Sequence, residues 1–333
     1  MNVLIVGGTQ FIGLAIAKKL LEEKHNLTVF HRGIHKMPFG NIEEIICDWH
    51  NSYKTEKILK GKKFDCVINT ICFSENDAYL SYKIFKDTTE HFIAISSASV
   101  YLLNPENYVP YTEESALLEI PRYYKENEKY RYEYGKRSAD IYFLTKYTRA
   151  GFPCTILRLP VVVGENDYTG RLATYFCQIK DEHPIILPDG GQNLWGFLYV
   201  EDLANFVVDI LKNKKSFGKT YNLSQKEGVS LRQLVLKMGK LLEKVPRIID
   251  IPSSYLIKVP LGLNFSPFYS SQHILLDIRK SIEDFNFSPT PFNKWIEKIV
   301  SIYKKNKPVD LFSSTRELEK DTIKKYLEHF RGF

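Results

Sequence analysis

The chain has 333 residues, of which 44% are hydrophobic and 26% charged, and its formal net charge is +7. This length suits one α/β body with a smaller second lobe, and the composition excludes a disordered chain. The lysines are spread along the sequence, so a solvated basic surface is favoured over a nucleic-acid groove. Nucleic-acid binding is therefore the weaker interpretation of the charge, although the charge does not exclude it.

The cysteines and the apolar runs indicate the cellular compartment in which the protein resides. The five cysteines are scattered and form no CxxC pair, which indicates neither a disulfide framework nor a zinc site, and we expect no metal. The apolar run NVLIV follows Met1 directly, and no later apolar run approaches the ~20 residues of a membrane span. We therefore expect a soluble, cytoplasmic protein without a membrane partner.

Short β-branched runs alternate with amphipathic segments in the first half of the chain. Such alternation is typical of parallel strands joined by crossover helices. We predict an α/β fold with a Rossmann-type, doubly wound parallel sheet. Strands are expected at residues 2–6, 26–30, 43–47, 65–70, 91–96 and 153–159, with helices at 12–23, 54–59 and 134–149.

The pattern loosens after Pro160, where turn signals become frequent. A strand at 197–200 leads into a helix from Asp202, and Ser230 opens an amphipathic helix within 229–244. The tail from about residue 312 is helical and charged. We expect a dinucleotide-binding domain at residues 1–160 and a mainly substrate-binding lobe at 161–333, from which about 195–225 return to the first domain.

The stretch GGTQFIG, residues 7–13, lies between the first strand and the first helix. A dinucleotide loop needs glycine at a tight turn, at the approach to the pyrophosphate, and where the helix packs on the strand. Gly7 and Gly13 meet the first and last needs. Gln10 is tolerable in the middle if its backbone avoids a glycine-only conformation and its side chain points away from, or along, the phosphates. The flanking strand and helix favour dinucleotide binding over a plain strand-to-helix turn.

The second strand ends in His31 and Arg32, where an NAD enzyme usually carries an acid. A cationic pair suits a 2′-phosphate, so NADP(H) is preferred over NAD(H), although Arg32 facing solvent is the alternative. Asp48, after the third strand, is placed to meet the adenine amino group. An aspartate that merely opens the next turn would look the same.

Tyr132 and Lys136 form a YxxxK pair on one face of a predicted helix. The ammonium of Lys136 is expected to lower the phenol pKa of Tyr132, and it can also hold the nicotinamide ribose. Upstream, the strand at 91–96 runs into Ser97, whose hydroxyl can bond the same substrate oxygen as Tyr132. The three residues together favour general acid/base chemistry at a carbinol or carbonyl.

The stretches GGTQFIG, SSASVY and YEYGK together resemble the extended short-chain dehydrogenase/reductase superfamily, in its NAD-dependent epimerase/dehydratase group. LRLPVVVG (157–164) and FLYVEDLA (197–204) resemble later segments of that family. The resemblance implies Ser97, Tyr132 and Lys136 as catalytic residues. For the coenzyme it implies Gly7, Thr9, Gln10, Phe11, Ile12, Gly13, His31, Arg32, Asp48, Thr70, Tyr132, Lys136, Pro160 and Val163.

Three departures from the family pattern qualify this expectation. Gln10, with HRG after the second strand, is similar to an atypical branch that includes bacterial reductase-like proteins and chloroplast stem-loop RNA-binding proteins. Sugar-nucleotide 4,6-dehydratases carry Asp-Glu directly after the catalytic Ser/Thr, whereas this chain has Ala98-Ser99, which argues against dehydration. The long aromatic segment 104–131 is either a lid over the substrate or a tolerated surface insertion.

The resemblance implies an NAD(P)-dependent epimerase or reductase that acts on a sugar nucleotide or a related carbonyl or alcohol, and a homodimer. The alternative is a non-catalytic NADP(H)-sensing or RNA-binding protein of the same fold, against which the Ser-Tyr-Lys set argues. For every substrate candidate after Pro160, a surface arginine or a core aromatic is an equally good interpretation. Arg158 and Arg171 are candidates to meet a phosphate or carboxylate, Trp195 and Phe197 are candidates to form the wall of a sugar or base pocket, and Ser99 is a further substrate candidate.

Overall fold

The computed structural model describes residues 1–40, 42–104, 108–116 and 120–330. The chain divides into two compact units. Unit 1 comprises Met1–Val162, Phe197–Ser224 and Leu276–Pro289, and unit 2 comprises Val163–Gly196, Gln225–Leu275 and Thr290–Phe333.

Unit 1 is built on a seven-stranded sheet with the order β11-β6-β5-β4-β1-β2-β3. All neighbouring strands pair in parallel; Ile5 of β1, for example, lies opposite Val29 of β2 and Ile68 of β4. The predicted doubly wound α/β fold is therefore confirmed. The strands are β1 (Asn2–Val6), β2 (Asn26–His31), β3 (Glu43–Ile46), β4 (Cys66–Asn69), β5 (Phe92–Ser97), β6 (Cys154–Leu159) and β11 (Lys219–Asn222).

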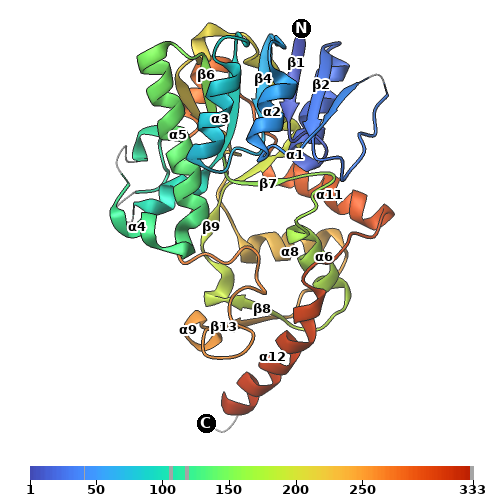
Figure 1. Ribbon diagram of the computed structural model, residues 1–333. Coiled ribbons are helices and arrows are strands. Elements are labelled where there is room, and N and C mark those ends of the chain that lie inside the picture. The colour runs from blue at the N-terminus through green and yellow to red at the C-terminus, as the bar shows by residue number, and fades with distance from the viewer. Residues whose placement is uncertain (41, 105–107, 117–119, 331–333) are drawn as a thin grey trace. The chain divides into compact units, whose positions relative to one another are not determined.

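Helices cover both faces of this sheet because its central strands are apolar on both sides. Val3 and Ile5 of β1 pack with helices α1, α7 and α10, whereas Leu4 and Val6 pack with α2, α3 and α5. Helices α3 and α5 run side by side (Figure 1). The helices are α1 (Phe11–Glu22), α2 (Ser52–Leu59), α3 (Glu75–Phe85), α4 (Arg122–Glu126), α5 (Arg131–Ala150), α7 (Val200–Asp209) and α10 (Arg279–Phe285).

Shorter elements complete unit 1. The 3-10 helix η1 (Ala98–Leu103) follows β5 directly, and η2 (Glu113–Ser115), η3 (Glu128–Tyr130) and η5 (Lys214–Ser216) lie in connections. Strand β7 (Val161–Val163) leaves the unit and β10 (Phe197–Tyr199) re-enters it.

The third segment of unit 1 is joined to the sheet edge through Asp284 of α10. Its carboxylate accepts hydrogen bonds from Lys219 Nζ at 2.9 Å and Tyr221 Oη at 2.8 Å, and Lys215 Nζ lies 3.0 Å away. Burial raises the pKa of Asp284, but these three donors outweigh burial and lower it to about 2. Strand β11 is thus held by a helix that begins some 60 residues further along the chain.

Unit 2 combines short strands with helices. Ser230 caps α8 through a reciprocal pair of bonds with Gln233, as expected, but the helix begins at Leu231 and ends at Leu241, and Val229 and Ser230 form strand β12. The elements are α6 (Arg171–Lys180), β8 (Ile185–Pro188), η4 (Asp189–Gly191), β9 (Leu194–Trp195), β12 (Val229–Ser230), α8 (Leu231–Leu241), β13 (Ile248–Ile251), α9 (Ser253–Leu256), α11 (Phe292–Lys305), η6 (Ser313–Thr315) and α12 (Arg316–Phe330).

The predicted helical tail is α12, and a buried ion network attaches it to the rest of unit 2. Arg316 pairs with Asp181 at 2.8 Å and with Glu319, whose carboxylate also accepts the amide of Ile186. Ile323 on the same helix packs with Ile186 and Leu256 in the core of this unit.

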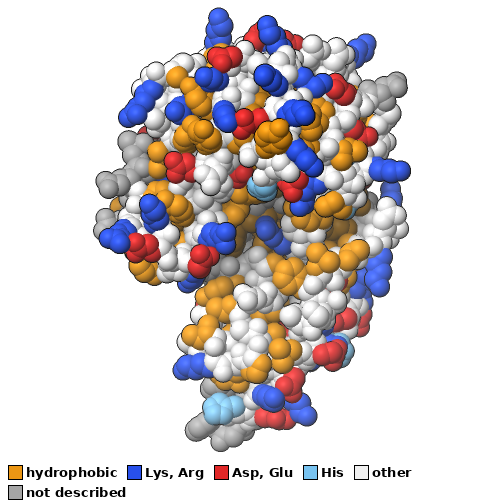
Figure 2. All heavy atoms as spheres, in the orientation of Figure 1, with side chains coloured by type: hydrophobic (Ala, Val, Ile, Leu, Met, Phe, Trp, Pro, Cys, Tyr) orange, Lys and Arg blue, Asp and Glu red, His pale blue; other side chains and the backbone are white. Residues whose placement is uncertain are grey.

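The charged surface, the apolar character of the helices and the state of the cysteines can be compared with the composition. On the face that Figure 2 shows, lysine and arginine side chains are interspersed with acidic ones. Among the helices of the described ranges, none has the length and apolar character needed to cross a bilayer. The five cysteines are all free thiols.

Candidate active site

The strand order reverses between β1 and β4, and ligands of open α/β sheets bind beyond the carboxyl ends of the strands at such a reversal. The loop after β1 lies there. Gly7 adopts φ +90°, and a Cβ on Gly13 would come within 2.5 Å of Gly7 O and 2.7 Å of Gly8 Cα. Both positions therefore require glycine for the reasons that a dinucleotide loop requires it.

Gln10 occupies the middle of this loop without needing glycine. It is the N-cap residue of α1, its φ and ψ are −139° and 152°, and its side chain is exposed. This is extended backbone that any residue adopts, and the positive φ of the loop falls instead on Gly7 and on Phe11, at +37°. The departure from the glycine pattern therefore leaves the backbone of the loop intact. The neighbouring Thr9 and Ile12 are half-buried.

Thr70, the first residue after β4, closes the loop from the other side of the reversal. Its hydroxyl donates to Val6 O and Gly7 O, each at 3.0 Å. The two strands that flank the reversal are thus fastened together where the pyrophosphate of a dinucleotide is expected. The amides of the first turn of α1 face the same place, since the first N–H groups of a helix have no intrahelical partner.

The structure corrects the expectation of a cationic pair at the end of β2. His31 is 6% exposed, and its Nδ1 accepts the amide of Gly33 at 3.1 Å. That nitrogen carries no proton, so Nε2 carries it and donates to Glu44 at 2.8 Å. His31 is therefore a neutral ring that shapes the turn. Arg32 is exposed and pairs with no residue in the described ranges, so it alone is available to an anion.

Asp48 lies after β3, as expected. One carboxylate oxygen accepts the amide of His50 at 3.0 Å, and the side chain is exposed. Asp48 therefore opens the turn that follows β3, and its second carboxylate oxygen stays available to a ligand.

Ser97 is the last residue of β5 and caps η1. Its Oγ accepts the amide of Ser99 at 3.2 Å, which orients the hydroxyl at the carboxyl edge of the sheet. The Oγ atoms of Ser96 and Ser99 are buried and have no hydrogen-bond partner among the described residues. A buried hydroxyl without a partner is costly, so Ser99 is suited to meet a polar group of a substrate.

Tyr132 and Lys136 lie one turn apart on α5, but their surroundings differ. Tyr132 is 47% exposed, whereas Lys136 is 3% exposed. The ammonium of Lys136 donates to Ile95 O on β5 and to Cys72 O in the loop after β4, both at 2.8 Å. Lys136 is thereby fixed beside the strand that ends in Ser97, so the structure gathers the catalytic candidates at one edge of the sheet.

Two residues that the sequence did not single out bring the loop after β4 onto α5. Gly135 is buried, and a Cβ there would come within 2.3 Å of Phe73 O. The ring of Phe73 lies over Lys136 Nζ, 4.5 Å from its centroid, and its centroid is 6.4 Å from that of Tyr132. Phe73 N is in turn held by Asp77 Oδ2 at 3.0 Å.

Arg158 is not available to a substrate, which corrects the expectation that it meets a phosphate or carboxylate. It is 2% exposed, and its Nε donates to Asp140 at 2.9 Å. Its Nη1 also donates to Tyr101 Oη at 3.1 Å and to Glu113 O at 2.8 Å. Burial raises the pKa of Tyr101 to about 12, so the phenol stays neutral beside the guanidinium.

The segment 104–131 lies partly outside the described residues, namely at 105–107 and 117–119. Its described middle is attached to unit 1: Glu113 accepts the amide of Asn222 at 2.8 Å, and Asn222 donates to Tyr111 O at 2.9 Å. Whether the segment is a lid stays a prediction.

The remaining candidates are distributed between the units. Pro160 follows β6 in unit 1. Arg171 opens α6, Val163 is fully buried, and half-buried Trp195 in β9 packs on Phe268, all in unit 2. Phe197 is 2% exposed, so it does not offer its ring to a ligand, which corrects its expected role as a pocket wall.

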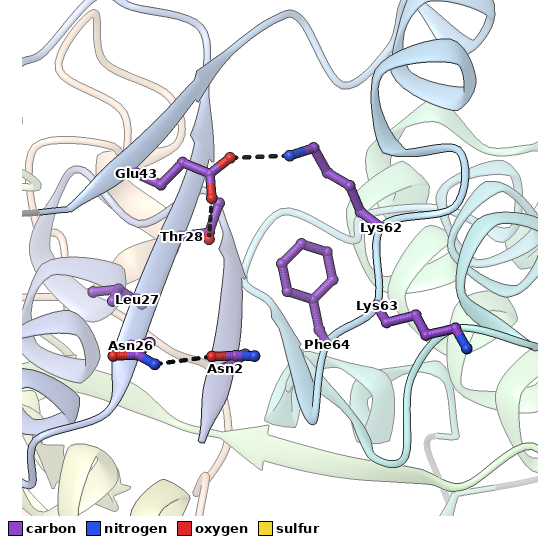
Figure 3. A pocket seen from close by; sticks show the side chains of 8 residues that line it. All are labelled: Asn2, Asn26, Leu27, Thr28, Glu43, Lys62, Lys63 and Phe64. Atoms are coloured by element: carbon purple, nitrogen blue, oxygen red, sulfur yellow. Dashed lines mark hydrogen bonds and ion pairs between the residues drawn. The ribbon is translucent and has the colours of Figure 1, made fainter.

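A cavity of about 440 Å³ lies at the opposite, amino end of the sheet. There Glu43 joins Lys62 Nζ at 3.0 Å to the Thr28 hydroxyl at 3.1 Å, and Asn26 donates to Asn2, beside Phe64 (Figure 3). This cavity shares no residue with the candidate active site, and its polar side chains mostly bond one another, so we do not assign it to coenzyme or substrate.

Comparison with known proteins agrees with this geometry. A model of the NAD dependent epimerase/dehydratase family matches residues 3–84 and 80–224. The chain belongs to this family, and the recognition of the group from its motifs is confirmed. The name of this family describes NAD-dependent epimerases and dehydratases.

Two curated relatives differ in what their names describe. The chain is 26% identical over 253 residues to the chloroplast stem-loop binding protein of 41 kDa b of Arabidopsis thaliana, a match that covers 72% of this chain and 62% of that protein. The chain thus spans less than two thirds of that relative's length. It is 21% identical over 261 residues to 2'-dehydrokanamycin reductase of Streptomyces kanamyceticus, covering 77% and 70% of the two chains.

Solved structures share the fold at low identity. dTDP-glucose 4,6-dehydratase of Bacillus anthracis, in complex with NAD, has a TM-score of 0.73 at 18% identity and covers 92% of this chain and 97% of its own. UDP-glucose 4-epimerase of Thermotoga maritima, with UDP-glucose, has a TM-score of 0.71 at 18% identity and covers 92% and 99%. These likenesses establish the architecture alone.

Proposed function

We propose that the chain is an NADP(H)-preferring reductase or epimerase that acts on a hydroxyl or carbonyl carbon of a sugar nucleotide or a related small molecule. The observation that carries the proposal is the pairing of Tyr132 with a buried Lys136 at the same sheet edge as Ser97 and the glycine loop. The names of the solved neighbours, which include sugar-nucleotide epimerases and a dehydratase, support the substrate class.

The residues fit a dinucleotide. Gly7, Gly13 and the first turn of α1 would receive its pyrophosphate, and Asp48 its adenine. Arg32, exposed and unpaired within the described ranges, would contact a 2′-phosphate, which supports NADP(H) over NAD(H). When bound, the nicotinamide supplies the hydride donor or acceptor.

The protein's own residues would handle the proton. Tyr132 would give a proton to, or take one from, the substrate oxygen, and Ser97 would orient that oxygen. Lys136 would favour the phenolate of Tyr132 through its charge. Ala98 and Ser99 supply no carboxyl group, so elimination of water is not part of the proposal.

Calorimetric titration with NADPH and NADH tests the coenzyme assignment. We expect NADPH to bind more tightly, and Arg32→Ala to weaken NADPH by about 1–3 kcal/mol, the scale of a charge-assisted hydrogen bond, while NADH is unaffected. Arg149→Ala, an exposed arginine in the last turn of α5, is the matched control. An equal loss for both coenzymes would contradict the role of Arg32, and failure of both to bind would remove the proposed activity.

A substrate screen tests the reaction class. Sugar nucleotides and related ketones are incubated with the protein and NADPH, and products are separated by mass and by stereochemistry. A reductase consumes NADPH in proportion to product, whereas an epimerase converts substrate without net consumption. Tyr132→Phe is expected to abolish either reaction, and turnover that survives this change would contradict the assignment of Tyr132.

RNA binding is a second candidate, and the similarity to the chloroplast stem-loop binding protein favours it. Fluorescence anisotropy with a stem-loop RNA, at several salt concentrations, tests it. Salt-dependent binding that Tyr132→Phe leaves unchanged, together with no coenzyme turnover, would place this function first. Absence of salt-dependent binding would remove it.

We further propose a homodimer in a reducing compartment such as the cytoplasm. The five free thiols support the compartment. Sedimentation equilibrium distinguishes a 38.8 kDa monomer from a species of about twice that mass.

A further inference from the structure

Phe73 contacts both members of the Tyr132–Lys136 pair. Its ring centroid lies 4.5 Å from Lys136 Nζ and 6.4 Å from the centroid of Tyr132. The ring is 45% exposed, whereas the ammonium beneath it belongs to a side chain that is only 3% exposed. The ring of Phe73 therefore separates the Lys136 ammonium from solvent on this side, and we call this ring the cover.

The position of this cover is fixed by its backbone. Asp77 accepts the amide of Phe73, Gly135 leaves room for the carbonyl of Phe73 against α5, and Lys136 donates to the carbonyl of Cys72, one residue earlier. Three contacts at two consecutive loop positions, Cys72 and Phe73, thus hold the ring in place over the ammonium.

Three titratable groups face Lys136 from the packed elements: Cys72 in the loop, Asp77 on α3 and Asp140 on α5. Burial raises the pKa of Cys72, so its thiol is neutral. Asp140 is engaged by Arg158, and Asp77 by the amide of Phe73 and the hydroxyl of Ser74. Burial lowers the pKa of Lys136, and the charges of Asp140 and Asp77 oppose this shift. Lys136 makes no ion pair with a carboxylate in the described part of the chain.

We propose that Phe73 is a positioning residue of the catalytic site, which seals the Lys136 ammonium from water so that its charge acts on the phenol of Tyr132. A charge shielded from water is felt more strongly by its neighbours. The inference rests on the proposed function, because it assigns Phe73 a part in the acid/base pair.

Two readouts that need neither substrate nor coenzyme test it. In the first, lysines are acetylated by a water-soluble ester and Lys136 is followed by mass spectrometry. We expect Phe73→Ala and Phe73→Gln to raise its rate of modification about tenfold or more, because both open the cover. Phe73→Leu keeps an apolar cover, and Tyr79→Ala removes an exposed aromatic of α3; both are expected to match the wild type.

In the second, tyrosine is labelled at the ring carbon that bears the hydroxyl, and the resonance of Tyr132, identified with Tyr132→Phe, is followed against pH. We expect its titration midpoint to lie about one pH unit higher in Phe73→Ala and Phe73→Gln than in the wild type. Phe73→Leu is expected to retain the wild-type midpoint. A structural role alone would not move this midpoint.

Lys136→Met separates failure of the inference from failure of the proposed function. Either of two outcomes overturns the role of Phe73 and leaves the Tyr132–Lys136 pair standing. In the first, the titration midpoint of Tyr132 rises in Lys136→Met but in neither Phe73→Ala nor Phe73→Gln. In the second, Lys136 stays unreactive towards acetylation in both Phe73 variants. If Lys136→Met also leaves the midpoint unchanged, the Tyr132–Lys136 pair itself is overturned. Phe73 is half exposed, so Phe73→Gln is expected to fold even if the alanine variant does not.

Discussion

Gly135 shows how one atom constrains the candidate site. In Gly135→Ala the new Cβ would fall 2.3 Å from Phe73 O, a backbone atom that can move only with its loop. We expect this clash to lower the free energy of unfolding by about 1–3 kcal/mol. The clash outweighs the ~1 kcal/mol that alanine contributes because it is a better helix former than glycine. Gly40→Ala, where a Cβ would meet no atom within 4 Å among the described residues beyond its chain neighbours, serves as control in urea unfolding. Equal stability of the two variants would contradict the contact.

The glycine loop allows a second residue-level prediction. Gln10→Gly is expected to change the coenzyme dissociation constant less than about threefold, because position 10 has an extended backbone that glycine does not improve. Gly13→Ala is expected to weaken coenzyme binding at least tenfold, since its Cβ would meet Gly7 O. Calorimetry of both variants is the measurement, and tighter binding by Gln10→Gly would contradict this account.

At this scale the sequence predicted the motif residues but not what surrounds them. Ser97, Tyr132 and Lys136 could be found because their types and spacing carry the chemistry. Phe73 lies in a loop, and nothing local indicates that its ring covers Lys136, because that contact joins residues more than 60 positions apart. The contact of His31 with Glu44 likewise joins two different strands, and nothing local in the sequence indicates it.

Among the elements, α5 is joined to β6 by a buried ion pair. Asp140→Ala would leave Arg158 buried without its carboxylate, and we expect a loss of about 3–5 kcal/mol in the free energy of unfolding. Glu126→Ala breaks the exposed pair with Arg122 and is expected to cost less than about 1 kcal/mol. Urea unfolding of the two variants compares them. If both variants lost a similarly small free energy of unfolding, the buried ion pair would not be needed for stability.

Helix α3 was not expected from the sequence, although a signal was present. Ser74 accepts the amide of Asp77, and the Asp77 carboxylate accepts the Ser74 hydroxyl, so serine followed three residues later by an acid marks the helix start. In β1, β4, β5 and β6 both faces are buried and mostly apolar, and for this reason these strands were predicted to within one or two residues. Strand β11 was not, since polar Lys219, Thr220 and Asn222 outnumber its apolar residue.

For the whole molecule, His91 predicts how stability depends on pH. Burial lowers its pKa to about 3, its Nδ1 accepts the amide of Lys212 at 3.2 Å, and Nε2 lies 2.8 Å from the Thr155 hydroxyl. The folded chain keeps this ring neutral, whereas the unfolded chain takes up a proton below about pH 6.5. The free energy of unfolding should therefore fall as the pH drops from about 6.5 towards 4, by up to ~1.4 kcal/mol per pH unit.

Urea unfolding at a series of pH values measures this dependence. His91→Gln is expected to flatten the decrease between pH 6.5 and 4, although it lowers stability at neutral pH. His35→Gln, at an exposed histidine, is expected to leave the curve unchanged. A wild-type curve that is flat over this range would contradict the assignment of a neutral, buried ring.

The three-part composition of unit 1 bears on how the chain is made. A nascent chain that has reached residue 224 contains every strand of the seven-stranded sheet but lacks the carboxylate of Asp284, on which Lys219 and Tyr221 converge. During synthesis, β11 can form its bonds to Asp284 only after most of unit 2 has emerged from the ribosome. The unit that carries the candidate active site is thus completed only when its last segment, Leu276–Pro289, has been made, and no single cut in the chain releases the whole unit.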